Sequence, residues 1–177
     1  MLLTAESAVL LLIDLQQRLM PVIHDHEAVV ARSVRLAEAA QLLGVPIRAT
    51  EQSPAGLGAT VPPLAAYPQA TLAKTTFSAA ADPGFPALLP AGAGQVIIAG
   101  VEAHVCVMQT VLGLLGSGRR VVVAADAVGS RDPADRAAAL DRARQHGAEV
   151  VTSEMVLFEW LHDSRHPKFR EVQKLLR

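Results

Sequence analysis

Three residues of this sequence have side chains that together can transfer an acyl group. Cys106, the only cysteine in the chain, follows an apolar run, Asp14 ends another, and Lys74 lies at the end of a short strand-like segment, residues 71–75. A cysteine thiolate attacks a carbonyl carbon, and a nearby carboxylate accepts the thiol proton and returns it to a leaving amine. A lysine ammonium favours the anionic species. The three residues predict hydrolysis of an amide through a thioester.

Cys106 must lose its proton to act as a nucleophile, since a free cysteine is only slightly ionised at neutral pH. The sequence predicts that Cys106 lies in the first turn of a helix, where the positive end of the helix dipole favours an anion. Lys74 adds a positive charge, and Asp14 is the predicted base. Backbone N–H groups before Cys106 have no partner within the helix, so they can stabilise an oxyanion.

Each of these residues also has an ordinary structural interpretation. A lone buried cysteine is usually a small core hydrophobe, and a lysine is usually solvated. Asp126 also ends an apolar run, and we expect its carboxylate to bond loop N–H groups. His104 is an alternative base for Cys106, but residues two apart on a helix point to different faces, which favours Asp14.

The elements that must position these residues alternate along the chain. Apolar runs predict strands at residues 8–14, 45–50, 71–75, 95–99, 120–126 and 148–152. Helical spacing and capping residues predict helices at residues 27–43, 83–89, 103–115, 132–146, 153–161 and 167–176. Asp132 followed by Pro133 is a typical helix start, Ser153 is the predicted cap of the next helix, and residues 51–69, rich in proline and glycine, predict a loop.

This alternation predicts an α/β fold with three layers, in which helices cover both faces of a doubly wound sheet of about six parallel strands. Residues 8–13 are continuously apolar, as is typical of parallel strands that are buried on both sides. Asp14, Lys74 and Cys106 then lie at or just after carboxyl ends of strands, the edge where such sheets bind ligands. The 177 residues suit a single domain, residues 1–177.

Composition narrows the range of partners. The formal net charge is −1, from 16 basic and 17 acidic residues, and only 3% of residues are aromatic. We therefore expect a small-molecule substrate and neither nucleic acid nor an anionic membrane. The apolar run near the N-terminus is too short to span a bilayer and lacks a preceding basic residue. A single cysteine excludes an intramolecular disulfide, which favours a cytoplasmic location, and the 51% apolar content favours a homo-oligomer.

Several segments of the chain resemble one known family. The segments Leu11–Gln17, Lys74–Ser78 and Gly100–Cys106 resemble the landmark motifs of the isochorismatase-like cysteine hydrolases, which include nicotinamidases and N-carbamoylsarcosine amidases. Residues 125–131, 152–155 and 166–169 resemble the isochorismatase domain-containing subgroup. The resemblance covers nearly the whole chain in order.

This resemblance implies a Rossmann-like fold with Cys106 as nucleophile, Asp14 as general base and Lys74 as a supporting charge. It also implies a cis peptide bond between Val101 and Glu102, with the backbone amides of Glu102 and Cys106 as oxyanion donors. We expect the substrate pocket to include Gln16, Leu19, Gln52, Phe77 and His104.

The sequence departs from its relatives in ways that bear on cofactors. Nicotinamidases hold a metal with an Asp-x-His pair, where this chain has Glu51-Gln52-Ser53, and no histidine lies between His26 and His104. No other histidine forms a ligand pattern, so we expect no metal and no cofactor. In the family a threonine is often found where this chain has Ala103.

Three interpretations therefore stand. The first is a metal-independent cysteine hydrolase of a small amide or related C–N bond. The second is an isochorismatase-type vinyl-ether hydrolase that uses Asp14 and Lys74, although isochorismatases lack the cysteine. The third is a non-catalytic binding or scaffold member of the fold. The matched set of Asp14, Lys74 and Cys106 favours an enzyme.

Overall fold

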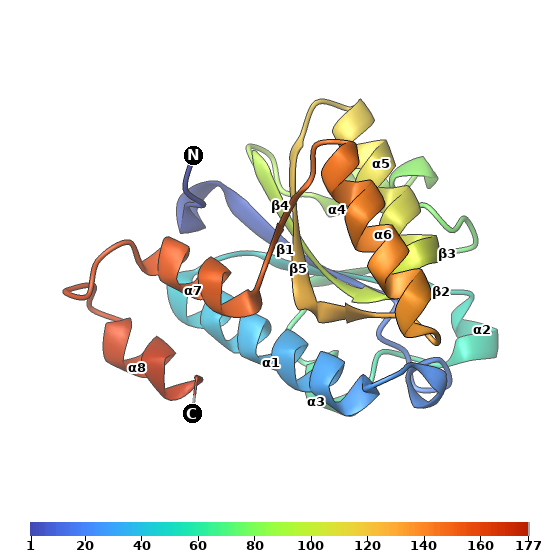
Figure 1. The fold of residues 1–177 in the computed structure, drawn as a ribbon, viewed down its shortest axis with the longest axis horizontal. Coiled ribbons are helices and arrows are strands. Elements are labelled where there is room, and N and C mark those ends of the chain that lie inside the picture. Colours follow the sequence, from blue (N-terminus) through green and yellow to red (C-terminus); the bar gives the residue numbers. More distant parts are fainter. Residues whose placement is uncertain (177) are drawn as a thin grey trace.

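The computed structural model describes residues 1–176. A single parallel sheet of six strands runs through the molecule in the order β3-β2-β1-β4-β5-β6 (Figure 1). The strands are β1 (Ala8–Ile13), β2 (Ile47–Gln52), β3 (Ala70–Lys74), β4 (Gln95–Val101), β5 (Arg120–Gly129) and β6 (Glu149–Val151). The predicted sheet of six parallel strands is confirmed.

Helices cover both faces of the sheet and complete the three predicted layers (Figure 1). One layer contains α1 (His26–Leu43), α3 (Pro62–Ala65), α7 (Ser153–Leu161) and α8 (Phe169–Lys174). The other contains α4 (Phe85–Leu88), α5 (Met108–Gly116) and α6 (Pro133–Gln145). Short helices in the connections are η1 (Ala5–Ser7), η2 (Met20–Val22), α2 (Pro54–Leu57) and η3 (Ala79–Ala81). None of the helices among residues 1–176 is long and apolar enough to cross a membrane.

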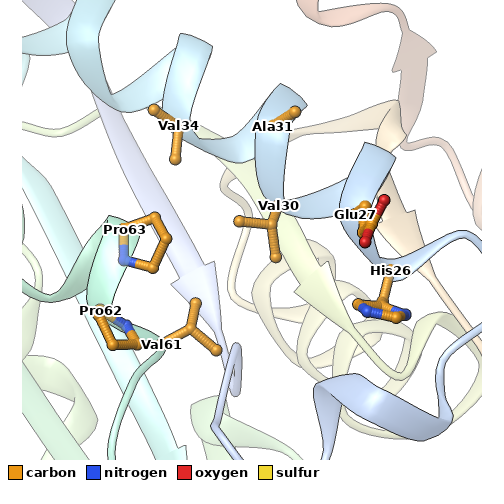
Figure 2. A pocket seen from close by; sticks show the side chains of 8 residues that line it. All are labelled: His26, Glu27, Val30, Ala31, Val34, Val61, Pro62 and Pro63. Atoms are coloured by element: carbon orange, nitrogen blue, oxygen red, sulfur yellow. The ribbon is translucent and has the colours of Figure 1, made fainter.

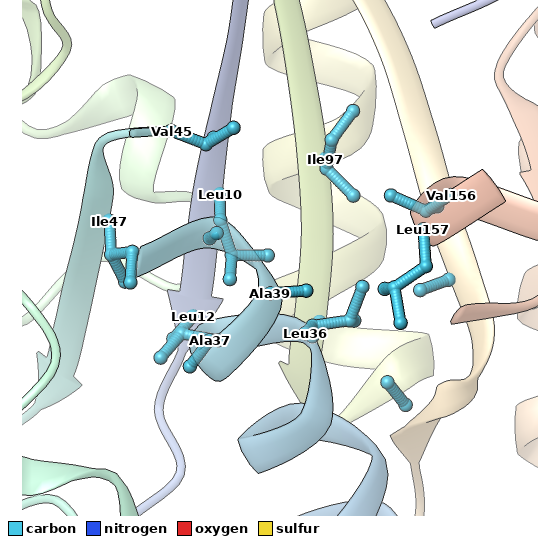
Figure 3. Packing of buried hydrophobic residues seen from close by; sticks show 14 of the residues in the cluster. Leu10, Leu12, Leu36, Ala37, Ala39, Val45, Ile47, Ile97, Val156 and Leu157 are labelled. Carbon is cyan, nitrogen blue, oxygen red and sulfur yellow. The ribbon is translucent and has the colours of Figure 1, made fainter. Parts of the chain in front are cut away.

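The central strand β1 shows why its sequence is continuously apolar. All six of its residues are buried. Successive side chains point to opposite faces, so Leu10 and Leu12 pack under α1, whereas Val9 and Leu11 pack under the other layer. Figure 3 shows Leu12 beside Ala37 of α1 and Leu10 near Ala39 of the same helix. Each buried leucine stabilises the fold by roughly 1.5–3 kcal/mol.

Two of the predicted helix boundaries can be checked against their caps. Asp132 accepts a hydrogen bond from the backbone N–H of Ala134, which confirms the predicted start of α6. The predicted Ser153 cap of α7 is wrong, because the cap is Thr152, whose hydroxyl accepts from the Met155 N–H. Ser153 is buried and bonds elsewhere.

Some connections differ from the prediction. Residues 51–69 do not form only a loop, because β2 continues to Gln52 and the single-turn helices α2 and α3 follow. Each begins with a proline, which the first turn of a helix tolerates. The helix predicted at 103–115 is divided into a π-helical turn, η4 (Ala103–Val107), and α5.

Gly100 of β4 pairs with Ile13 of β1. Its φ is +133°, a conformation that side chains rarely adopt. A Cβ at this position would lie 2.1 Å from the carbonyl oxygen of Ile13. Glycine therefore allows the two strands that lead to Asp14 and Cys106 to lie side by side.

Candidate active site

The topology brings the three predicted catalytic residues to one edge of the sheet. Asp14 directly follows β1, Lys74 is the last residue of β3, and Cys106 lies in η4 after β4. β1 and β4 are neighbours in the sheet, and β3 lies on the other side of β1 with β2 between them. Their carboxyl ends meet at the same edge, as expected for ligand sites in parallel sheets.

Asp14 is a fully buried carboxylate with a partner for each oxygen. Its backbone turns into the left-handed region, with φ at 53°. The Thr50 hydroxyl donates to Asp14 Oδ1 at 2.6 Å, and Lys74 Nζ donates to Asp14 Oδ2 at 2.8 Å. The Asp14 and Lys74 side chains are both 0% exposed, so each charge depends on the other for compensation.

The Lys74 ammonium is surrounded by protein acceptors. Besides Asp14 Oδ2, it donates to Gln52 Oε1 at 2.7 Å and lies 3.2 Å and 3.3 Å from the carbonyl oxygens of Thr76 and Phe77. An ammonium has three N–H donors, so these four acceptors occupy all of them. Lys74 is therefore placed to supply charge rather than a hydrogen bond to a substrate.

Cys106 is buried, with 6% of its surface exposed, and lies in the π-helical turn η4. The carbonyl of Glu102 accepts from the amides of Val105 at 3.1 Å and Val107 at 3.2 Å. In an α-helix this carbonyl would accept from the Cys106 amide, four residues on, whereas the π-helical bond reaches Val107, five residues on.

Burial and, next, the negative charge of Asp14 raise the pKa of the Cys106 thiol, while Lys74 opposes the rise, and the net result is a pKa of about 12. From the sequence, the helix dipole, Lys74 and Asp14 were expected to increase the thiolate fraction of Cys106. In the structure, burial and Asp14 outweigh Lys74, so the resting residue is a protonated thiol. Attack on a carbonyl then requires a base that takes the proton during the reaction.

The peptide bond between Val101 and Glu102 is cis. It directly precedes η4, so the cis bond and Cys106 belong to one short segment. The Glu102 carboxylate accepts from the backbone N–H of Arg131 at 3.1 Å and from its Nε at 2.9 Å. This pair connects the segment to the loop after β5.

The residues that were expected to line one substrate pocket have different surroundings in the structure. Gln16 is fully buried, and its amide bonds the backbone of Gln52 and the carbonyl of Gly58. The Gln52 side chain bonds Lys74 and the carbonyl of Thr75. Both amides are therefore engaged by the protein itself.

The other three expected pocket residues have different surroundings. Leu19 is half-buried against the core under α1. Phe77 is 55% exposed. His104 Nδ1 lies 3.0 Å from Ser130 Oγ, and its Nε2 lies 3.5 Å from Asp135 Oδ2. These partners of His104 lie in the loop after β5 and in α6, consistent with the preference for Asp14 as base.

Some residues around the site had weaker signals in the sequence. Thr50, like Asp14, was predicted at the carboxyl end of a strand. A threonine alone, however, does not indicate a carboxylate partner. Asp126 was expected to bond loop N–H groups, but it accepts instead from the backbone N–H and the hydroxyl of Ser153, the first residue of α7, both at 2.6 Å.

Metal-ligating side chains do not gather in the part of the chain that the structure describes. No group of three or more His, Cys, Asp or Glu residues among residues 1–176 could hold a metal ion. Glu51, in the segment that aligns with the nicotinamidase ligands, instead accepts from the backbone N–H and the hydroxyl of Thr60.

An apolar groove lies away from the three predicted catalytic residues. It has a volume of about 590 Å³ and lies between α1 and the start of α3 (Figure 2). Val30, Val34 and Val61 point into it, and His26 and Glu27 lie at one end. It includes none of the three predicted catalytic residues, so the candidate active site is defined by its chemistry rather than by cavity size.

Known proteins are similar to this chain in sequence and in fold. The Isochorismatase domain model matches residues 8–155. The chain is 42% identical to isochorismatase domain-containing protein 2 of Danio rerio over 98% of this chain and 89% of that protein. The structure of the MAR1 ribonuclease from Caenorhabditis elegans matches with a TM-score of 0.93 and 38% identity, over 99% of this chain and 92% of that chain.

A bacterial structure is also similar. The YcaC gene product from Escherichia coli, an octameric hydrolase of unknown specificity, matches with a TM-score of 0.86 and 27% identity, over 98% of this chain and 95% of that chain. The fold, the order of the motifs and these relatives agree. The chain belongs to the isochorismatase-like family of hydrolases.

Proposed function

We propose that this protein is a cysteine hydrolase that cleaves a small amide or a related C–N bond through a thioester. The observation that carries the proposal is the buried Asp14 carboxylate, held by Thr50 and Lys74 and near enough to Cys106 to act on its pKa. This arrangement supplies a nucleophile, a base and a compensating positive charge.

In the first half of the proposed reaction, Asp14 takes the thiol proton while Cys106 Sγ forms a bond to the substrate carbonyl carbon. The raised pKa of the thiol favours this order, because no thiolate stands ready beforehand. The backbone amides of Glu102 and Cys106 are the proposed donors to the oxyanion. The C–N bond then breaks, Asp14 returns the proton to the leaving nitrogen, and a thioester remains.

In the second half, Asp14 takes a proton from a water molecule whose oxygen attacks the thioester carbon. The C–S bond breaks, the sulfur regains a proton from Asp14, and the carboxylic acid leaves. Lys74 stays charged throughout and offsets the negative charge of Asp14 in a site that excludes solvent.

A screen for ammonia released from a library of small amides tests this function. We expect one class of amide to be hydrolysed by the wild-type protein, with the activity lost in Cys106→Ala and retained in a control, Gln69→Met, at the other end of β2. Hydrolysis that survives Cys106→Ala would overturn the thioester mechanism and favour a cysteine-free reaction of the vinyl-ether type.

The substrate is proposed to be a small molecule, although three of the similar structures carry the name MAR1 ribonuclease. The chain has 16 basic and 17 acidic residues, which gives no excess of positive charge for a polyanion. A free buried thiol also suits a reducing compartment such as the cytoplasm.

The protein is further proposed to form a homo-oligomer. The octameric relative supports this proposal. Light scattering coupled to size-exclusion chromatography would test it, and a monomer at all accessible concentrations would contradict it.

A further inference from the structure

The lysine of the candidate site is held unequally by its four acceptors. Asp14 Oδ2 and Gln52 Oε1 lie 2.8 Å and 2.7 Å from Lys74 Nζ. The carbonyl oxygens of Thr76 and Phe77 lie farther away, at 3.2 Å and 3.3 Å. The two short bonds therefore decide where the ammonium lies, and one of them comes from Gln52.

Gln52 is itself fixed at both its side chain and its backbone. Its Nε2 donates to the carbonyl of Thr75 at 2.8 Å, so the amide oxygen remains for Lys74. Its backbone N–H donates to Gln16 Oε1 at 2.7 Å, and its carbonyl accepts from Gln16 Nε2 at 3.1 Å. Gln16 is completely buried and also bonds the carbonyl of Gly58 at 2.7 Å.

We propose that Gln52 is a positioning residue, which holds the Lys74 ammonium against Asp14 and is held in turn by Gln16. The sequence suggested that both glutamines contact the substrate. The hydrogen bonds assign them instead to a connected series that begins in the loop after β1 and ends at Asp14.

A physical need for such a residue follows from the nature of lysine. Its ammonium is carried on a flexible four-carbon stem, and ordering that stem costs rotamer entropy. A buried ion pair stabilises only when further hydrogen bonds satisfy the remaining protons. Gln52 supplies such a bond on a neutral side chain, so it orders the lysine without cancelling its charge.

The single cysteine provides a direct readout of the ammonium position. Lys74 lowers the pKa of Cys106, opposing burial and Asp14, so displacement of the ammonium reduces the thiolate available for alkylation. The rate of modification of the whole protein by iodoacetamide at pH 8.5, followed by mass spectrometry, reports this change. The readout needs no substrate, so it stands even where the proposed amide hydrolysis fails.

We expect Gln52→Met to slow this alkylation about fivefold, equivalent to a pKa rise of roughly 0.7. Gln52→Asn, which keeps the amide but withdraws it by one methylene, should do the same where the methionine variant folds poorly. The matched control is Gln69→Met. Gln69 Oε1 accepts from Ile47 N and Arg48 Nη1 at the opposite end of β2, and its loss should leave the rate unchanged.

A charge-free background separates positioning from a general structural effect. Removing both partners of a buried ion pair is often tolerated, so Asp14→Asn with Lys74→Met serves as that background. If Gln52 acts through Lys74, adding Gln52→Met there should change the alkylation rate by less than about 1.5-fold. An equal slowing in both backgrounds, or no slowing in the wild-type background, would overturn the proposal.

Discussion

Asp14 and Cys106 lie at neighbouring strand ends but in different environments. Asp14 belongs to a polar half of the site, where Thr50, Gln52 and Lys74 connect the ends of β1, β2 and β3 through short hydrogen bonds. Cys106 belongs to an apolar half, in the core cluster under α5 and α6. The first half is held by charge and hydrogen bonds, and the second by packing and by the path of the backbone.

This difference predicts what each half contributes to stability and to reactivity. A buried carboxylate keeps its charge only with partners, so the polar half must be rigid and complete. The Cys106 thiol packs as a small hydrophobe, and Asp14 and Lys74 of the polar half act on its pKa. Substitutions in the polar half should therefore cost stability, whereas substitutions of the thiol should cost reactivity.

The largest effect should appear in the reactivity of the thiol. A pKa of about 12 against the ordinary 9.0 leaves about 1000-fold less thiolate at neutral pH, so iodoacetamide should modify Cys106 about 1000-fold more slowly than a model thiol. The rate should rise tenfold per pH unit from pH 7 to 10. A plateau in this range would contradict the apolar character assigned to the half that holds Cys106.

The same pKa difference has a consequence for stability. Because the folded pKa lies above the unfolded value, the contribution of Cys106 is fully present below pH 9 and is lost as the pH rises toward 12. Above pH 9 the free energy of unfolding of the wild-type protein, measured by urea titration, should therefore fall with pH more steeply than that of Cys106→Ala.

Breaking the ion pair should have the next largest effect. Lys74→Met leaves Asp14 buried without a counter-charge and should lower the free energy of unfolding by about 3–5 kcal/mol in urea titrations at pH 7. The double variant Asp14→Asn/Lys74→Met should recover most of this loss. A single variant as stable as the wild-type protein would show that the polar half does not depend on charge compensation.

A smaller loss should follow from the neutral partner of Asp14. Thr50→Val removes the 2.6 Å hydrogen bond to Oδ1 and should cost about 1–3 kcal/mol, toward the upper end because the acceptor is charged. Thr110→Val is the matched change in the apolar half, where the hydroxyl accepts from the uncharged Ala79 N–H at 2.9 Å. An equal cost for both variants, measured by urea unfolding, would erase the distinction between the halves.

The smallest change in stability should come from the nucleophile itself. Cys106→Ala removes one atom from an apolar cluster and should change the free energy of unfolding by about 1 kcal/mol. Thermal and urea unfolding at pH 7 would measure this. A loss above that of Thr50→Val would mean that the interactions of the thiol with Asp14 and Lys74 stabilise the fold more than the Thr50–Asp14 hydrogen bond does.

Features that depend on where a residue stands relative to a strand or a helix could be predicted from the sequence. That Asp14 and Lys74 meet could be predicted because each lies at the end of a predicted strand, and parallel strands bring such ends to one edge. The same reasoning predicted the sheet and the cap of α6. These features follow from local patterns that tertiary contacts reinforce.

Other features depend on contacts that no local pattern encodes. The π-helical turn at Cys106 differs from an α-helix by one residue in hydrogen-bond spacing, too little to read from five residues. The raised pKa of the thiol requires knowledge of burial in three dimensions. Thr152 and Ser153 are both good caps, and only the contact of Ser153 with Asp126 explains the choice.

Gly100 offers a criterion for interpreting other sequences of this family. The distance between the polar and apolar halves of the site depends at this point on the lack of a side chain, since a Cβ would meet the Ile13 carbonyl oxygen at 2.1 Å. A family member with another residue there must separate these strands or change their path. Its retained aspartate and cysteine would then not suffice to assign it the same chemistry.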